Sequence, residues 1–105
     1  MGATARIGGT QMASPWRRRR MCVLIAEHPC PAALRQVSAS GAFLETNARP
    51  VLGARVELHH PVAGAIEAEV SSLTHDGVGL AFRTSERSVA FALAAIAADM
   101  SRPAA

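Results

Sequence analysis

Apolar and polar residues alternate over several short stretches of this chain. Ile66, Ala68 and Val70 alternate with the polar residues Glu67, Glu69 and Ser71. Residues 55–59 alternate in the same way, with Val56 and Leu58 on one side. A period of two is typical of a strand that buries one face and exposes the other. The pattern therefore predicts a mainly β chain built from short antiparallel strands.

Turn residues divide the chain into six expected strands. Pro29 and Pro31 are expected to interrupt the chain after the first strand, and Asp76-Gly77 is a hairpin signal because both residues tolerate positive φ. The first three expected strands are residues 21–27, 32–37 and 42–46. The fourth begins at Gly53 and ends at a turn over residues 61–64. The fifth runs from Ile66 towards Leu73, and the sixth contains Val78, Leu80 and Phe82. Six short strands curl into a barrel, which removes exposed edges. We therefore expect a six-stranded antiparallel β-barrel.

A C-terminal α-helix is expected after the last strand. Ser85 can cap it, and an apolar stripe at helical spacing follows, made of Val89, Leu93, Ile96 and Met100. We expect this stripe to close one opening of the barrel. Phe91 lies almost opposite, on a second and weaker apolar face. That face either packs against the preceding chain or contacts a partner.

The chain ends differ from this patterned region. Residues 1–15 are rich in Gly, Ala, Thr and Ser and show no periodicity, which predicts a disordered leader. We expect one domain over residues 16–100 and a disordered tail over residues 101–105. A chain of 105 residues is long enough to bury one hydrophobic core, because domains commonly have about 100 to 150 residues.

Positive charge is concentrated near the N-terminus. Residues 1–20 hold five arginines and no acid, whereas residues 21–105 hold six arginines and eight acids. Four arginines in succession end a flexible N-terminal arm: Arg17, Arg18, Arg19 and Arg20. Such a run without a basic helix or an aromatic sheet face does not predict a nucleic acid polymer as partner. Either the arm binds a smaller anionic ligand or it is a solvated basic tail.

The apolar runs of the sequence and any export signal bear on where in the cell the protein is expected. The longest apolar run, residues 89–98, is shorter than the roughly 20 residues of a membrane-spanning helix. The N-terminus lacks the apolar core of a secretory signal, so we expect a cytoplasmic protein without a membrane span. Cys22 and Cys30 are then expected to be reduced thiols.

Metal and catalytic sites are not expected. The spacing of the cysteines, His28 and the His59-His60 pair fits none of the common zinc patterns. Ser38 and Ser40 have no histidine or carboxylate placed by a motif to activate them. We therefore expect neither a metal centre nor an enzyme.

Two motifs resemble those of the PilZ domain family. Residues 36–41, Gln-Val-Ser-Ala-Ser-Gly, are similar to the family's (D/N)xSxxG motif, and residues 76–82, Asp-Gly-Val-Gly-Leu-Ala-Phe, are similar to its common ending G-V-G-hydrophobic-x-F. The resemblance covers roughly residues 16–100, as in a stand-alone single-domain member with degenerate motifs. It implies a six-stranded β-barrel with a C-terminal helix and an arginine-bearing N-terminal arm.

The resemblance implies binding of the bacterial second messenger cyclic di-GMP, with no other cofactor. The implied ligand-binding residues are Arg17, Arg18, Arg19 and Arg20 of the arm and Gln36, Ser38 and Gly41 of the hairpin. Arginine forks bond to guanine edges and to phosphate oxygens. Ser38 would offer a hydroxyl, and Gly41 would allow close approach of the ligand. Binding would order the arm and signal through an unidentified effector protein.

Two departures from the motifs support a second hypothesis. Gln36 stands where the family usually has Asp or Asn, and Trp16 stands four residues before Arg20, where an RxxxR motif has arginine. Arg17 substitutes for that arginine if the arm slips by one residue. The alternative is a degenerate PilZ-like adaptor that does not bind the nucleotide and docks on a protein through the barrel face or Phe91. A homodimer also stays open.

Overall fold

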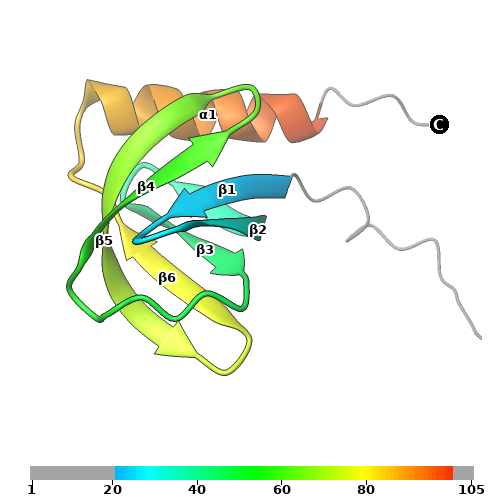
Figure 1. Ribbon diagram of the computed structural model, residues 1–105. Helices are drawn as coiled ribbons and strands as arrows, with labels where there is room; N and C mark the ends of the chain where they lie inside the picture. Colours follow the sequence, from blue (N-terminus) through cyan, green and yellow to red (C-terminus); the bar gives the residue numbers. More distant parts are fainter. Residues whose placement is uncertain (1–20, 101–105) are drawn as a thin grey trace, which may run out of the picture.

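The structure is a computed structural model that describes residues 21–100, and the side chains of residues 21–99. Six antiparallel strands form a closed barrel in this range, and the helix α1 (Glu86–Met100) lies across one end of it (Figure 1). The strands are β1 (Met21–Ile25), β2 (Pro29–Ser38), β3 (Gly41–Glu45), β4 (Arg55–His60), β5 (Gly64–Thr74) and β6 (Gly77–Ala81). The predicted fold class is confirmed for this part of the chain. The expected leader, the arm and the tail beyond residue 100 lie outside the described residues.

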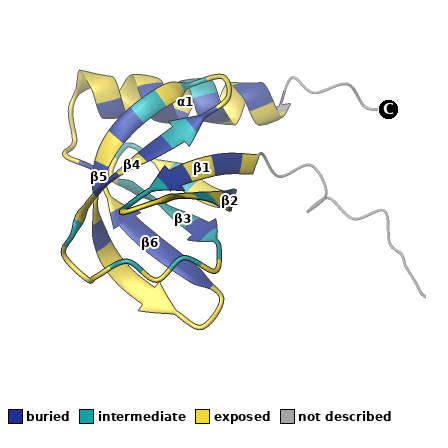
Figure 2. Ribbon diagram, in the orientation of Figure 1, coloured by how far each residue is buried: buried dark blue, intermediate teal, exposed yellow. Residues whose placement is uncertain are grey.

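The strands follow the order β1-β2-β3-β6-β5-β4 around the barrel, and β1 pairs with β4 to close the ring. Buried and exposed residues alternate along β4 and β5 (Figure 2). Val56, Leu58 and Ile66 point into the core, as the sequence pattern predicts. Within residues 21–100, no helix has the length and apolar content needed to cross a bilayer.

The two prolines do not interrupt the strands as expected. Pro29 and Pro31 belong to β2 and pair with Ile25 and Val23 of β1. Pairing of β2 with β3 begins only at Ala33. This part of β2 therefore has a strand neighbour on one side, where a residue without a backbone N–H is tolerated.

The turn between β5 and β6 lies one residue earlier than Asp76-Gly77 predicts. Thr74 pairs with Gly77, so the turn residues are His75 and Asp76. Within the described chain, Gly53 and Gly64 are the glycines with positive φ, at 87° and 90°. Gly64 ends the turn that was expected over residues 61–64. Gly77 instead serves as a strand residue.

The helix packs with a different face from the one expected. Phe91 is buried with its neighbours Ser88, Ala92, Ala95 and Ala98. The predicted stripe points to solvent, because Val89, Leu93 and Ile96 keep 43%, 62% and 40% of their surface exposed. The expectation that this stripe closes the barrel is therefore wrong for these residues. Phe91 instead covers the core, because its ring contacts the rings of His60 and Phe82 at centroid distances of 6.0 and 5.6 Å.

Candidate functional site

The predicted hairpin residues lie together on the outer surface of β2 and β3. Ser38 and Gly41 are directly paired, and Gln36 pairs with Phe43. Gln36 and Ser38 are exposed. The Ser38 hydroxyl accepts a hydrogen bond from the backbone N–H of Ser40 at 3.2 Å and lies 3.1 Å from the Ser40 hydroxyl. The hairpin therefore presents two hydroxyls and one amide to solvent.

A β-bulge in β2 determines which side chains face outward on this surface. Leu34 pairs with Leu44 and Gln36 pairs with Phe43, so Arg35 is an extra residue in the ladder. Such a β-bulge places two successive residues opposite one partner. Leu34 and Val37 both pack against the core, although three positions separate them. Arg35 and Gln36 are consequently both exposed.

Arg35 reaches from β2 across β3 and stacks over Phe43. Its guanidinium carbon lies 5.2 Å from the centroid of the Phe43 ring. Its Nη1 lies 3.2 Å from a carboxylate oxygen of Glu45 and 3.2 Å from one of Asp76. The Phe43 ring in turn covers Gly77, where an added Cβ would lie 2.6 Å from the ring. Two carboxylates and an aromatic ring thus hold the guanidinium on the outer surface.

The β5–β6 turn is anchored on both sides of Asp76. The Thr74 hydroxyl donates a hydrogen bond to the other Asp76 oxygen at 2.7 Å. Arg49, from the β3–β4 loop, donates to the carbonyls of His75 at 2.8 Å and Gly77 at 3.2 Å. The hydrogen bond from Thr74, followed by that from Arg35, lowers the pKa of Asp76 below its usual value of 3.8. Asp76 therefore stays ionised and keeps its hold on Arg35 over a wide pH range.

Gly41 has a structural role that the motif did not indicate. A Cβ at this position would overlap the backbone carbonyl oxygen of Leu80 in β6. The carbonyl of the preceding turn residue, Ser40, accepts a hydrogen bond from the N–H of Phe82 at 2.9 Å. Close packing of β3 on β6 therefore requires glycine here whether or not a ligand binds.

The two halves of the expected ligand site differ in what the structure describes. Gln36, Ser38 and Gly41 are brought together as expected. The arm residues Arg17, Arg18, Arg19 and Arg20, and Trp16 with them, lie outside the described residues. Closure of the arm over the hairpin therefore stays a prediction. Sequence reasoning also missed Arg35 and Phe43, although the three-residue separation of Leu34 and Val37 is a signal of the bulge.

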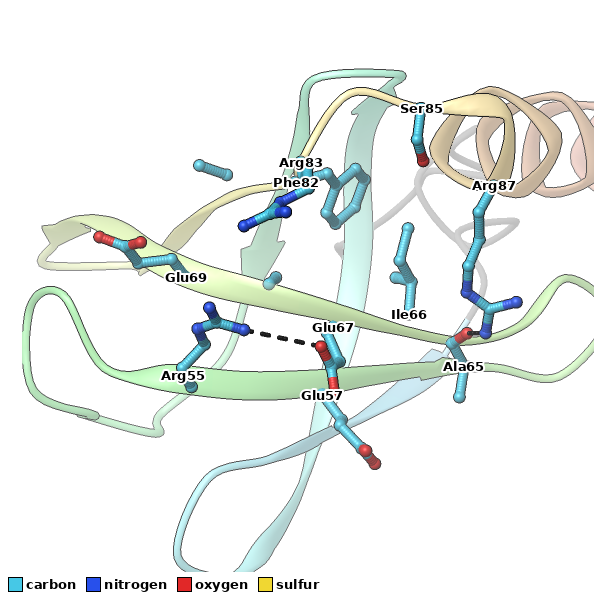
Figure 3. A pocket seen from close by; sticks show the side chains of 12 residues that line it. Arg55, Glu57, Ala65, Ile66, Glu67, Glu69, Phe82, Arg83, Ser85 and Arg87 are labelled. Carbon is cyan, nitrogen blue, oxygen red and sulfur yellow. Dashed lines mark hydrogen bonds and ion pairs between the residues drawn. The ribbon is translucent and has the colours of Figure 1, made fainter.

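A groove of about 740 Å³ lies elsewhere on the barrel, over β4 and β5 (Figure 3). Its rim carries three arginines and three glutamates, namely Arg55, Arg83, Arg87, Glu57, Glu67 and Glu69. Arg55 and Glu67 form an ion pair at 3.6 Å with both side chains mostly exposed, and such pairs add little to stability. Opposite charges balance around this groove. Of the predicted ligand residues that the structure describes, Gln36, Ser38 and Gly41, none lines it.

The cysteines and histidines considered for zinc are distributed over the barrel. Cys22 is buried in the core, and Cys30 is a partly buried free thiol. His59 interacts with Glu57 at 2.9 Å, whereas the buried His60 ring accepts hydrogen bonds from the N–H groups of Val62 and Ala63 at 3.0 Å. Among residues 21–100, no three such side chains gather as metal ligands.

No family model matches this chain, and a search of curated proteins finds no significant match.

Proposed function

We propose that this protein is a PilZ-like receptor module that binds cyclic di-GMP on the outer surface of the β2–β3 hairpin. One observation carries the proposal: the motif residues Gln36, Ser38 and Gly41 lie together on this surface at the end of a closed six-stranded barrel. A ligand with guanine bases and phosphates suits the amide and hydroxyl groups exposed there. The resemblance to PilZ domains supplies the identity of the ligand.

Binding would bring the arm residues Arg17 to Arg20 against the ligand. Ordering of an arm costs conformational entropy, which lowers affinity but produces a new surface. An effector protein that recognises the closed arm would receive the signal in the bacterial cytoplasm. The module itself has no catalytic role in this proposal.

Calorimetric titration with cyclic di-GMP tests the receptor proposal. GTP and linear pGpG are the ligand controls, and two salt concentrations report the phosphate contacts, because screening weakens them. Ser38→Ala and Arg20→Ala are expected to weaken binding, whereas Arg83→Ala, in the groove over β4 and β5, is expected to leave it unchanged. Unchanged affinity in both Ser38→Ala and Arg20→Ala would contradict the proposed site.

A second candidate is an adaptor that binds protein and no nucleotide. The observation that favours it is the exposed apolar stripe of Val89, Leu93 and Ile96 on α1. Phe91 does not form this surface, because it is only 4% exposed and Phe91→Glu would disrupt the core instead of an interface.

The adaptor candidate makes a separate prediction. Leu93→Glu should abolish association with a protein partner, or with a second copy in sedimentation experiments, while the fold is retained. Ser38→Ala should leave that association intact. Absence of calorimetric heat with cyclic di-GMP together with this pattern would favour the adaptor over the receptor.

A further inference from the structure

We propose that Arg35, held over Phe43, is a stacking platform for a purine base beside the β2–β3 hairpin. The inference rests on the proposed function, because it names a further base-contacting residue of the same surface. Neither motif includes Arg35. The β-bulge places it there, since the extra residue turns both Arg35 and Gln36 outward opposite Phe43.

The guanidinium is held in place before any ligand arrives. Glu45 belongs to β3 and Asp76 to the β5–β6 turn, and both bind Nη1 at 3.2 Å. The guanidinium carbon lies 5.2 Å from the centroid of the Phe43 ring, and that ring packs against Gly77. A planar group fixed by three neighbours loses little conformational entropy when a ligand stacks on it.

The guanidinium is also accessible. The Arg35 side chain keeps 37% of its surface exposed, although one side is covered by Phe43. The outer surface next to it has small residues, because Gly41 pairs with Ala81 and Phe43 pairs with Gly79. The face of the guanidinium that does not lie over Phe43 is the one on which a flat base would stack. Gln36 directly follows Arg35 on the same surface, and its amide can bond to the edge of the base.

The chemistry of arginine suits a stacking platform better than that of lysine does. Partly exposed ion pairs contribute little to stability, and lysine would supply the same charge to Glu45 and Asp76. Only arginine offers a planar face that stacks on an aromatic ring on one side and on a base on the other. A purine has a larger ring system than a pyrimidine and stacks more strongly, so the expected ligand class is a purine nucleotide.

Nuclear magnetic resonance titration of the full chain with GMP tests the platform separately from binding of the cyclic ligand. A purine stacked on Arg35 should shift the side-chain N–H signal of Arg35 upfield through its ring current. Ribose 5-phosphate, which has a phosphate but no base, should not cause this upfield shift. Equal responses to the two compounds, or no response of Arg35 to GMP, would overturn the proposal.

Calorimetry with cyclic di-GMP provides the second test. Arg35→Lys keeps the positive charge and is expected to weaken binding about tenfold or more, because loss of one stacking contact has roughly this effect. Arg55→Lys is the matched control, since Arg55 forms an exposed ion pair on another part of the barrel. Thermal unfolding of both variants checks that they fold. Wild-type affinity in Arg35→Lys would overturn the platform.

The two tests separate the two proposals. If the wild-type protein does not bind cyclic di-GMP but GMP shifts the Arg35 signal, the proposed receptor function fails and the platform stands. If cyclic di-GMP binds and Arg35→Lys binds equally well, the receptor function stands and the platform fails.

Discussion

Phe91 of α1 meets Phe82 at the end of β6 edge to face, with ring centroids 5.6 Å apart and planes at 74°. His60 contacts the same Phe91 ring at 6.0 Å and 80°. One aromatic side chain thus joins the helix to β4 and to the residue that follows β6. Ala92 and Ala95 are buried beside it, and their small size lets the helix lie close to the barrel. The position of α1 therefore depends on Phe91 and not on the longer apolar stripe.

Phe91→Ala is expected to destabilise the protein by about 3 to 5 kcal/mol, because truncation of a buried phenyl ring leaves a cavity. Leu93→Ala is the matched control on the exposed face, where a change within about 0.5 kcal/mol is expected. Urea unfolding followed by circular dichroism measures both free energies. Similar losses in the two variants would contradict the observed helix orientation.

Gly41→Ala is expected to destabilise the barrel by about 1 to 3 kcal/mol, because its Cβ would overlap the Leu80 carbonyl and force β3 away from β6. Ser40→Ala is the control within the same exposed turn. Unfolding in urea without any ligand distinguishes this structural role from a binding role. If Gly41→Ala were as stable as the wild type, the close strand packing would be refuted.

The pKa of Asp76 should fall below 3.8 in the folded protein, mainly because Thr74 donates a hydrogen bond to it. A lowered folded pKa stabilises the protein above the unfolded pKa, and this contribution is lost as pH falls through the folded pKa. The stability difference between wild type and Asp76→Asn should therefore shrink as pH drops below about 4.

In an NMR titration, Thr74→Val should raise the pKa of Asp76 towards its ordinary value. An unchanged pKa in Thr74→Val would exclude this cause.

Ser85→Ala is expected to cost about 1 kcal/mol, because the Ser85 hydroxyl accepts a hydrogen bond from the Ser88 N–H at 3.2 Å. The Ser88 hydroxyl in turn accepts a hydrogen bond from the Ser85 N–H at 2.9 Å. Ser85→Asp keeps an acceptor at the cap and should retain most of the stability. Thermal unfolding measures the difference, and equal losses in both variants would argue against capping by this side chain.

Alternation alone was sufficient to predict most of the barrel. Val56, Leu58, Ile66 and Val70 point inward as expected, because each lies in a regular strand with one buried face. The hairpin with Ser38 and Gly41 was also predicted correctly, since its small residues lie at the turn between two apolar segments.

Two features could not be read from periodicity. The bulge at Arg35 changes the side to which later residues of β2 point, so a regular period of two misplaces the outward groups. The helix has two apolar faces, and spacing alone does not decide which one packs. The rings of His60 and Phe82 decide it, because they form a site for an aromatic side chain that Phe91 fills and that aliphatic Leu93 does not enter.

Closure of the ring by β1 and β4 determines how partners can recognise the described part of this protein. Each of its six strands pairs with a neighbour on both sides along part of its length, whereas residues 29–32 of β2 and 72–74 of β5 pair on one side alone. These one-sided stretches are short, so they give an extended peptide little backbone along which to add itself, a common mode of binding to open sheets. Discrimination between partners must come from side chains on the outer surface, so the identity of a few exposed residues, and not the backbone, determines specificity.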